Sequence, residues 1–283
     1  MKKIFSMMIG GIAACLLLGG TVFCQTAPVP APATEAARVA GVPATVNVEH
    51  PLMPVIRWAE QARPKIAAIQ DYTATLRKQE NINGRLHGVQ VMEIKVRHEP
   101  FSVYTRFLFP NNMQGQQAIY VEGQNDNRLV AHGVGIQRLA GTMMLPPDGF
   151  LPMQGQKYPI TMMGILNLVD QLVEAAHHTI RIGGECVVTY HEGVVLGTGE
   201  SARECTMIQI VLPERRRDHI FHIARIFVDN ELNLPIRYES HDWPNRPGEP
   251  PVLHEVYQYM DLKLNVGLTD ADFDHKNPKY NFP

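Results

Sequence analysis

The first periodic pattern of apolar residues in the chain is that of a helix. From residue 51, apolar side chains recur at spacings of three and four, which places them on one face of a helix. They are Leu52, Val55, Ile56, Ala59, Ile66 and Ile69. Pro64 lies inside this pattern, so we expect it to kink or divide the helix. A second pattern over residues 161–178 alternates an apolar face from Met162 to Ala176 with a polar face, and predicts an amphipathic lid or plug for a sheet.

Between and after these helices the apolar positions alternate, which predicts strands. The predicted strands cover residues 72–77, 89–97, 101–109, 117–122, 128–132, 184–190, 205–212, 219–229, 235–240 and 254–264. Asn83-Gly84 is a hairpin signal after the first of them. Because the connections are short, the strands favour an antiparallel meander over βαβ units. We therefore predict a mainly β fold of the α+β class, in a single domain over residues 51–283.

The residues ahead of this domain have the pattern of an export signal. Lys2 and Lys3 precede an uncharged apolar run over residues 4–23, which predicts a signal peptide over 1–24. Four glycines within the run and the Pro-rich stretch behind it argue against a membrane-spanning anchor. Residues 25–50 are rich in proline and alanine and predict a disordered tether. We expect an exported protein of the periplasm or cell envelope.

Two cysteines in the signal leave lipid attachment open. Val22 and Cys24 fit cleavage before Gln25, whereas the bulky Phe23 does not fit a lipid site at Cys24. The letters Ile12-Ala13-Ala14-Cys15 do fit such a site, but three leucines follow where a polar tether is expected. The chain is thus either released after cleavage or a lipoprotein, and we expect membrane association only through a lipid on Cys15.

The net charge and the other two cysteines bear on the kind of partner and on the stability of the mature protein. The formal net charge is −2, and it becomes about −4 once the two signal lysines are removed, which gives no support to nucleic-acid binding. Cys186 and Cys205 remain in the mature chain and are a disulfide candidate in an oxidising compartment. They could face each other across a hairpin, or they could be two buried thiols.

The sequence offers no catalytic motif, no metal site and no cofactor motif. Asp270, Asp272 and Asp274 have calcium-loop spacing, but His275 and Asn281 stand where an EF-hand needs Gly and Glu, so a capped turn is the better interpretation. The histidine pairs 177–178 and 219/222 point away from each other on their elements. Arg215-Arg216-Arg217 reads as an exposed turn, with contact to an anionic partner as the alternative.

Methionine is the unusual feature that is left. Met143, Met144, Met153, Met162 and Met163 fall at the loop before the second helix and at its start. Flexible thioethers suit surfaces that accept irregular apolar ligands, and they also suit ordinary core filling. If a ligand cavity exists, our candidates for its lining are Met143, Met144, Met153, Met162, Ile165, Leu166 and Val169.

Four stretches resemble a known bacterial envelope family. They read DYTATLRKQENINGRL, VRHEPFSVYTRFLFP, GQQAIYVEGQNDNRLVAH and LTDADFDHKNPKYNF. The chain is similar to domain-of-unknown-function family 1571, which resembles the LolA/LppX-like lipoprotein-carrier superfamily. The resemblance covers about residues 51–283. It implies a LolA-like fold, a strongly curved antiparallel sheet or incomplete β-barrel covered by helices, with an apolar cavity for acyl chains in the carrier members.

From this resemblance we expect non-catalytic binding of a lipid, a lipoprotein acyl chain or another amphiphile in a half-barrel cavity. No cofactor and no nucleic acid are expected as partners. One alternative is a regulatory or structural envelope protein that contacts a protein partner through its sheet. A less favoured alternative is an unrecognised hydrolase, which needs a cleft where a histidine and a carboxylate converge with perturbed titration.

Overall fold

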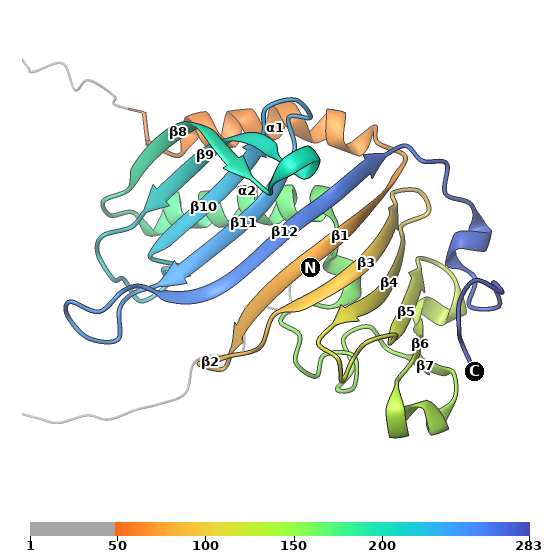
Figure 1. Cartoon of the computed structure of the whole chain (residues 1–283). Helices are drawn as coiled ribbons and strands as arrows, with labels where there is room; N and C mark the ends of the chain where they lie inside the picture. Colours follow the sequence, from red (N-terminus) through yellow and green to blue (C-terminus); the bar gives the residue numbers. More distant parts are fainter. Residues whose placement is uncertain (1–48) are drawn as a thin grey trace, which may run out of the picture. The chain divides into compact units, whose positions relative to one another are not determined.

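One antiparallel sheet runs through the computed structural model, which describes residues 49–283 (Figure 1). The predicted signal segment 1–24 and all of the predicted tether except residues 49 and 50 lie outside the described residues. The strands are β1 (Asp71–Ile82), β2 (Arg85–Leu86), β3 (Gln90–Arg97), β4 (Ser102–Phe109), β5 (Gln117–Val121), β6 (Leu129–His132), β7 (Met143–Leu145), β8 (Val187–Leu196), β9 (Arg203–Val211), β10 (Ile223–Asp229), β11 (Pro235–Asp242) and β12 (Val252–Leu264). Their order is β7-β6-β5-β4-β3-β1-β12-β11-β10-β9-β8, and β2 pairs with β1.

The order of strands is that of two meanders joined at their long strands. Strands β3 to β7 form one meander and β8 to β12 the other, each strand pairing with its neighbours in sequence. Strand β1 lies between them and pairs with β3 and with the last strand, β12. The turn between β1 and β2 has positive φ at Asn83 and Gly84, as the Asn-Gly signal requires. The predicted mainly β fold with a curved antiparallel sheet and few helices is therefore confirmed.

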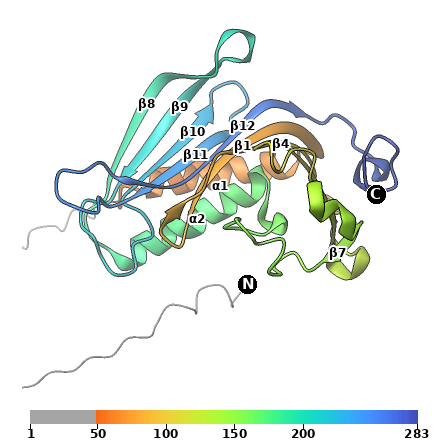
Figure 2. The same ribbon diagram turned by 60° about the horizontal axis from the view of Figure 1, so that its bottom comes forward.

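Two helices cover one face of the sheet, α1 (Met53–Ala67) and α2 (Ile165–Ile182) (Figures 1 and 2). The sheet curves toward that face, so the helices lie on its concave side. Helix α1 continues through Pro64, and the expected division is wrong. Pro64 removes the hydrogen bond to the carbonyl of Glu60, but both residues lie on the exposed face, where water can bind that carbonyl.

Helix α2 begins and ends four residues later than predicted. Residues Ile160–Met162 form a short 3-10 helix, and Gly164 separates it from α2 with a φ of 112°. Only glycine adopts that conformation without strain. At the other end Gly183, with a φ of 70°, caps the helix. Helix α2 is therefore bounded by a glycine at each end.

The remaining elements are short. Strand β7 was not predicted, and β8 runs six residues past its predicted end with a bulge opposite β9. Five 3-10 helices occur among the described residues: Asn125–Asn127, Gly135–Ala140, Ile160–Met162, Gly199–Ser201 and Asp270–Phe273. The segment of residues 146–164 leads from β7 back across the concave side to α2 (Figure 2). We call it the crossing segment.

Candidate ligand-binding site

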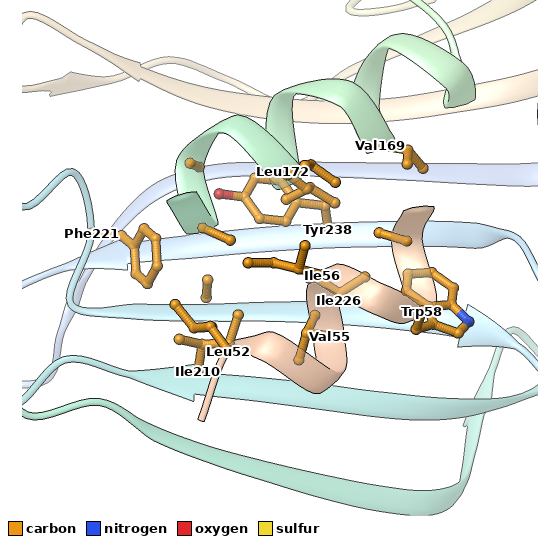
Figure 3. A pocket seen from close by; sticks show the side chains of 15 residues that line it. Leu52, Val55, Ile56, Trp58, Val169, Leu172, Ile210, Phe221, Ile226 and Tyr238 are labelled. Atoms are coloured by element: carbon orange, nitrogen blue, oxygen red, sulfur yellow. The ribbon is translucent and has the colours of Figure 1, made fainter. Parts of the chain in front are cut away.

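An apolar layer lies between α1, α2 and the strands β9, β10 and β11 (Figure 3). Its lining side chains are Leu52, Val55, Ile56, Trp58, Ala59, Val169, Leu172, Val173, Ala175, Ala176, Ile210, Phe221, Ala224, Ile226 and Tyr238. None of them carries a charge, and only Trp58 and Tyr238 have a polar side-chain atom. We call this set of residues the apolar layer.

The apolar layer forms because the apolar face of the helices packs on the apolar face of the strands. Side chains three and four apart on α1, such as Leu52, Val55 and Ile56, point to one side of the helix. On β10, Ala224 and Ile226 alternate with outward-facing Arg225 and so point at the helices. Small residues stand where the backbones approach, among them Ala176 on α2. The helical faces and one face of the sheet thus form a continuous apolar interior.

The free volume inside this layer is small. It amounts to about 30 Å³, which is room for no more than about two or three water molecules. An acyl chain does not fit into that volume. In this structure the layer is filled by its own side chains, so a chain gains room there only if a covering helix, α1 or α2, moves away from the sheet.

The side chains in the middle of α2 are only partly buried, and polar contacts hold its two ends. Leu168, Leu172 and Val173 are only half-buried although they pack against the core. At the start, the N–H of Ile165 donates a hydrogen bond to the hydroxyl of Tyr72, 2.9 Å away. Within α2, Asp170 forms an exposed ion pair with Arg63 of α1 at 2.6 Å, a type of pair that contributes only about 0–1 kcal/mol.

The C-terminal end of α2 is held by the loop between β9 and β10. The side chain of Arg216 donates to the carbonyl of Ile182 at 3.5 Å, and a ring nitrogen of His219 lies 3.3 Å from the carbonyl of Gly183. These groups satisfy carbonyls that have no partner inside the helix. They are weak or exposed contacts, so the helix can be displaced without breaking a buried charge pair at this end.

A buried polar network borders the apolar layer on β1 and β12. Lys78 lies 2.9 Å from Glu80, and Tyr257 donates a 2.6 Å hydrogen bond to the same carboxylate. Lys157 of the crossing segment donates to Glu255 at 2.7 Å, and its backbone N–H donates to Glu80 at 3.1 Å. Lys78, Glu80 and Glu255 are each at most 5% exposed. The network fastens the crossing segment to the sheet.

Burial changes the titration of this network. Desolvation lowers the pKa of Lys78 and outweighs the opposing effect of Glu80. It also lowers the pKa of His254, and the adjacent Lys157 lowers it further. The pKa values of Tyr158 and Tyr257 are raised by burial and then by Glu255. Each charged side chain in the network has a partner of opposite charge, which buried charges require.

The histidine of this network has no hydroxyl or thiol partner among residues 49–283. His254 and Glu255 both contact Lys157, so a histidine and a carboxylate do come together. Nucleophilic catalysis needs a hydroxyl or thiol within hydrogen-bond reach of the base. Within residues 49–283 the side-chain contact of His254 is with the amine of Lys157, and no serine, threonine or cysteine donates to it.

A comparison with known protein families identifies the family of the chain. The model of the family described as "Protein of unknown function (DUF1571)" matches residues 69–282, which is more than half of the chain. The chain belongs to this family. The resemblance expected from the four quoted stretches is therefore confirmed. No curated protein matches the chain.

Solved structures of similar fold include lipoproteins and their relatives. The Mycobacterium tuberculosis lipoprotein LppX is 13% identical, with 78% of this chain and 100% of that chain covered and a TM-score of 0.42. A LolA superfamily protein from Nitrosomonas europaea is 11% identical, with 76% and 97% covered and a TM-score of 0.29. A DUF1329 family protein from Desulfovibrio piger is 11% identical, with 80% and 98% covered and a TM-score of 0.37. At these values the similarities carry no inference about function.

In this DUF1571 member, the predicted lining residues are mostly away from the apolar layer. Of the seven, only Val169 lines it. Met143 and Met144 lie in β7 at the edge of the sheet, where Met144 is 51% exposed. Met153 lies in the crossing segment and Met162 in the 3-10 helix before α2. Ile165 and Leu166 belong to the neighbouring core around Tyr72.

The two mature cysteines are free thiols in this structure, which is the second of the two interpretations that the sequence left open. Cys205 in β9 lies opposite Val194 of β8, whereas Val187, the residue after Cys186, lies opposite Val211. The two cysteines therefore lie at different ends of the β8–β9 pair. Two residues lie opposite each other in a hairpin only if they are equally far from its turn. The connection between β8 and β9 lies around residue 199, which is not midway between the two cysteines. Cys205 is buried and Cys186 half-buried.

The other motifs are structural. Thr269 and Asp272 form a capping box at the 3-10 helix 270–273, and Lys95 binds Asp272 at 2.6 Å, so the acidic cluster is the capped turn that we preferred. Within residues 49–283, no three His, Cys, Asp or Glu side chains converge in a way that could hold a metal ion. Over the same residues, no helix has both the length and the apolar character needed to cross a membrane.

Proposed function

We propose that this chain binds the apolar chain of an amphiphile, such as a lipid or a lipoprotein acyl chain, without catalysis. The observation that supports the proposal is the apolar layer, which extends without a charged side chain from both helices to three strands. A chain inserted there contacts aliphatic side chains from α2 above and from β10 below. Val169 and Leu172 are among the α2 residues that line the layer (Figure 3).

On binding, α2 separates from the sheet. Burial of apolar chain contributes about 0.8 kcal/mol per CH₂, so roughly eight methylenes supply about 6 kcal/mol. As α2 moves, its buried side chains such as Val169 exchange their contacts with the sheet for contacts with the inserted chain. The polar contacts that are lost are exposed or solvent-facing, and each such hydrogen bond or ion pair contributes about 0–1.5 kcal/mol. The gain therefore exceeds the loss of the contacts at the C-terminal end of α2, while the bond of Ile165 to Tyr72 keeps the start of the helix in place.

Export is part of the proposal. A carrier of lipid or lipoprotein acyl chains acts where those molecules occur, in the periplasm or cell envelope, and residues 1–24 read as an export signal. Mass spectrometry of the protein from fractionated cells tests this point. A mature N-terminus at Gln25, or a diacylglycerol-modified Cys15, supports export, and an intact Met1 in the cytoplasmic fraction contradicts it.

The binding test uses fluorescent fatty acid together with mass spectrometry of organic extracts from the natively purified protein. Ala176→Leu fills the apolar layer and should weaken binding at least tenfold. Ala131→Leu is the matched control, because Ala131 is equally buried but belongs to a separate core at β6. Both changes overpack a core, at a cost of about 1–3 kcal/mol. Equal binding by the two folded variants, or absence of any lipid from the wild-type protein, contradicts the proposal.

Contact with a partner protein is the second candidate function. Exposed apolar side chains gather over residues 136–151: Ile136 and Leu139 are each 87% exposed and Phe150 is 80% exposed. Exposed apolar side chains so close in sequence are candidates for contact with a partner. The variant Ile136→Ser/Leu139→Ser separates the two candidates, since it leaves fatty-acid binding unchanged if the apolar layer is the site.

A further inference from the structure

A second cavity lies at the end of the sheet where two connections meet, the one from β9 to β10 and the one from β11 to β12. Its volume is about 570 Å³, within the range of small-molecule sites. The lining residues are Arg215, Arg216, Arg217, His219, Ile220, Asp242, Trp243 and His254. We call it the cationic cavity.

Positive charge dominates this cavity. Three guanidinium groups face it against a single carboxylate, that of Asp242. Arg216 is paired with Glu214 at 2.9 Å, which neutralises one of the three. Arg215 and Arg217 have no carboxylate at ion-pair distance within the part of the chain that the structure describes. Two arginines are therefore left to bind an anion, and the planar fork of arginine matches the oxygens of phosphate.

Trp243 forms an aromatic wall that orders these groups. The guanidinium of Arg215 lies 5.9 Å from the centre of its ring, and the ring of His222 stacks on it at 5.3 Å. The indole Nε1 donates to the carbonyl of Pro213 at 3.4 Å. A cation over an indole face is held in place by electrostatic attraction. Arg215 is thus positioned before any ligand arrives.

The cationic cavity adjoins the apolar layer. Ile220 lines the cavity, and the next residue, Phe221, lines the layer. Trp243 packs against the apolar cluster that contains Phe221 and Leu212. A polar site with two unneutralised arginines therefore lies beside an uncharged apolar one, which is the arrangement that an anionic amphiphile needs.

We propose that the cationic cavity binds the phosphate group of an anionic amphiphile whose apolar chain lies in the apolar layer. Arg215 and Arg217 bind the phosphate oxygens, and Trp243 packs on the first carbons that follow it. This inference rests on the proposed function, because the chain site and the phosphate site serve one ligand. It adds the ligand class, a single-chain or double-chain lipid with a phosphate headgroup.

The test compares three probes on the full mature protein: lysophosphatidylglycerol, a monoacylglycerol with the same acyl chain, and inorganic phosphate. Calorimetry should show lysophosphatidylglycerol binding at least about tenfold more tightly than the monoacylglycerol, since charge-assisted hydrogen bonds contribute that much or more. Arg215→Gln/Arg217→Gln should remove this preference and leave the monoacylglycerol affinity unchanged. Arg85→Gln/Arg128→Gln, which changes the net charge equally at two exposed positions elsewhere, should keep the preference.

The outcomes separate the two proposals. Equal affinities for the two lipids in the wild-type protein overturn the phosphate site and leave the chain site standing. Binding of inorganic phosphate through Arg215 and Arg217, without any lipid preference, reassigns the cavity to free phosphate and also overturns the headgroup proposal. Failure of both lipids to bind contradicts the proposed function itself.

Discussion

The hydroxyl of Tyr72 in β1 accepts a hydrogen bond from the backbone N–H of Ile165, at 2.9 Å, and so fixes the first turn of α2 to the sheet. Tyr72 is 1% exposed, so water cannot replace it. A Cβ at Gly164 would lie 3.1 Å from the same hydroxyl, which is a second reason for glycine at the start of the helix. The start of α2 is therefore held by a buried contact, whereas its C-terminal end is held by exposed ones.

Tyr72→Phe should lower the free energy of unfolding by about 1–2 kcal/mol, because it leaves a buried helix N–H without an acceptor. Urea unfolding measures the loss, and amide hydrogen exchange should show faster exchange in the first turn of α2. Tyr104→Phe is the control, since its hydroxyl makes a 2.9 Å bond to Gln117 far from α2. Unchanged exchange at α2 in Tyr72→Phe would show that this bond does not hold the helix.

Lys78→Met should cost about 3 kcal/mol of stability, because it leaves the buried carboxylate of Glu80 without its ammonium partner. Lys95→Met removes a lysine of the partly exposed pair with Asp272 and should cost about 1 kcal/mol or less. Chemical denaturation of both variants measures the difference. Equal losses would mean that burial does not set the strength of the network around Lys78.

The crossing segment should loosen as the pH falls from about 7 to 5. Burial and the adjacent Lys157 hold the pKa of His254 below its ordinary value of 6.5. A lowered folded-state pKa means that the unfolded or opened form binds the proton more readily, so the stabilisation is complete above about pH 6.5 and is lost as the pH falls through the folded-state pKa. Glu255 and Asp242 oppose the shift but do not reverse it.

Limited proteolysis within residues 146–164 measures this opening at several pH values. Cleavage of the wild-type protein should accelerate toward pH 5, and in His254→Gln the acceleration should be clearly smaller. Desolvation also lowers the pKa values of His98, His132 and His241, which lie elsewhere in the fold, so a local readout is needed. The same pH response in His254→Gln would assign it to those residues.

Periodicity in the sequence predicts the elements better than it predicts the site. The faces of α1 and of the long strands follow directly from spacing, since each is decided within its own segment. Strand β7 escapes because three residues are too few to show a period. The apolar layer joins residues as far apart as Leu52 and Tyr238, and no local pattern shows that β9 to β11 lie beneath α1.

The methionines and the cysteines show why a sequence alone does not locate a site. Met143 and Met144 are adjacent apolar residues, but their sequence does not show whether their side chains face the interior or the solvent. Cys186 and Cys205 flank a hairpin, but pairing depends on the strand register, which places Val194 and not Cys186 opposite Cys205. Both cases depend on which strands lie side by side and in which register, and this cannot be predicted from a single sequence.

Both mature thiols should therefore react slowly in the native protein. Burial raises the pKa values of Cys186 and Cys205 to about 11, so little thiolate is present at pH 8. Ellman's reagent should titrate two thiols rapidly in urea and neither rapidly without it. Intact mass after purification from an oxidising compartment should show two free thiols, and a loss of two hydrogens would establish the disulfide that the structure lacks.

Photo-crosslinking tests the central claim most directly. A fatty acid with a diazirine near the end of its chain is bound to the mature protein, irradiated and mapped by peptide mass spectrometry. The account predicts labels on the α2 peptide that contains Leu172 and Ala176 and on the β10 peptide that contains Ala224, with loss of both labels in Ala176→Leu. Labels confined to residues 136–151, or the same labels in Ala176→Leu as in the wild-type protein, would contradict binding between the helices and the sheet.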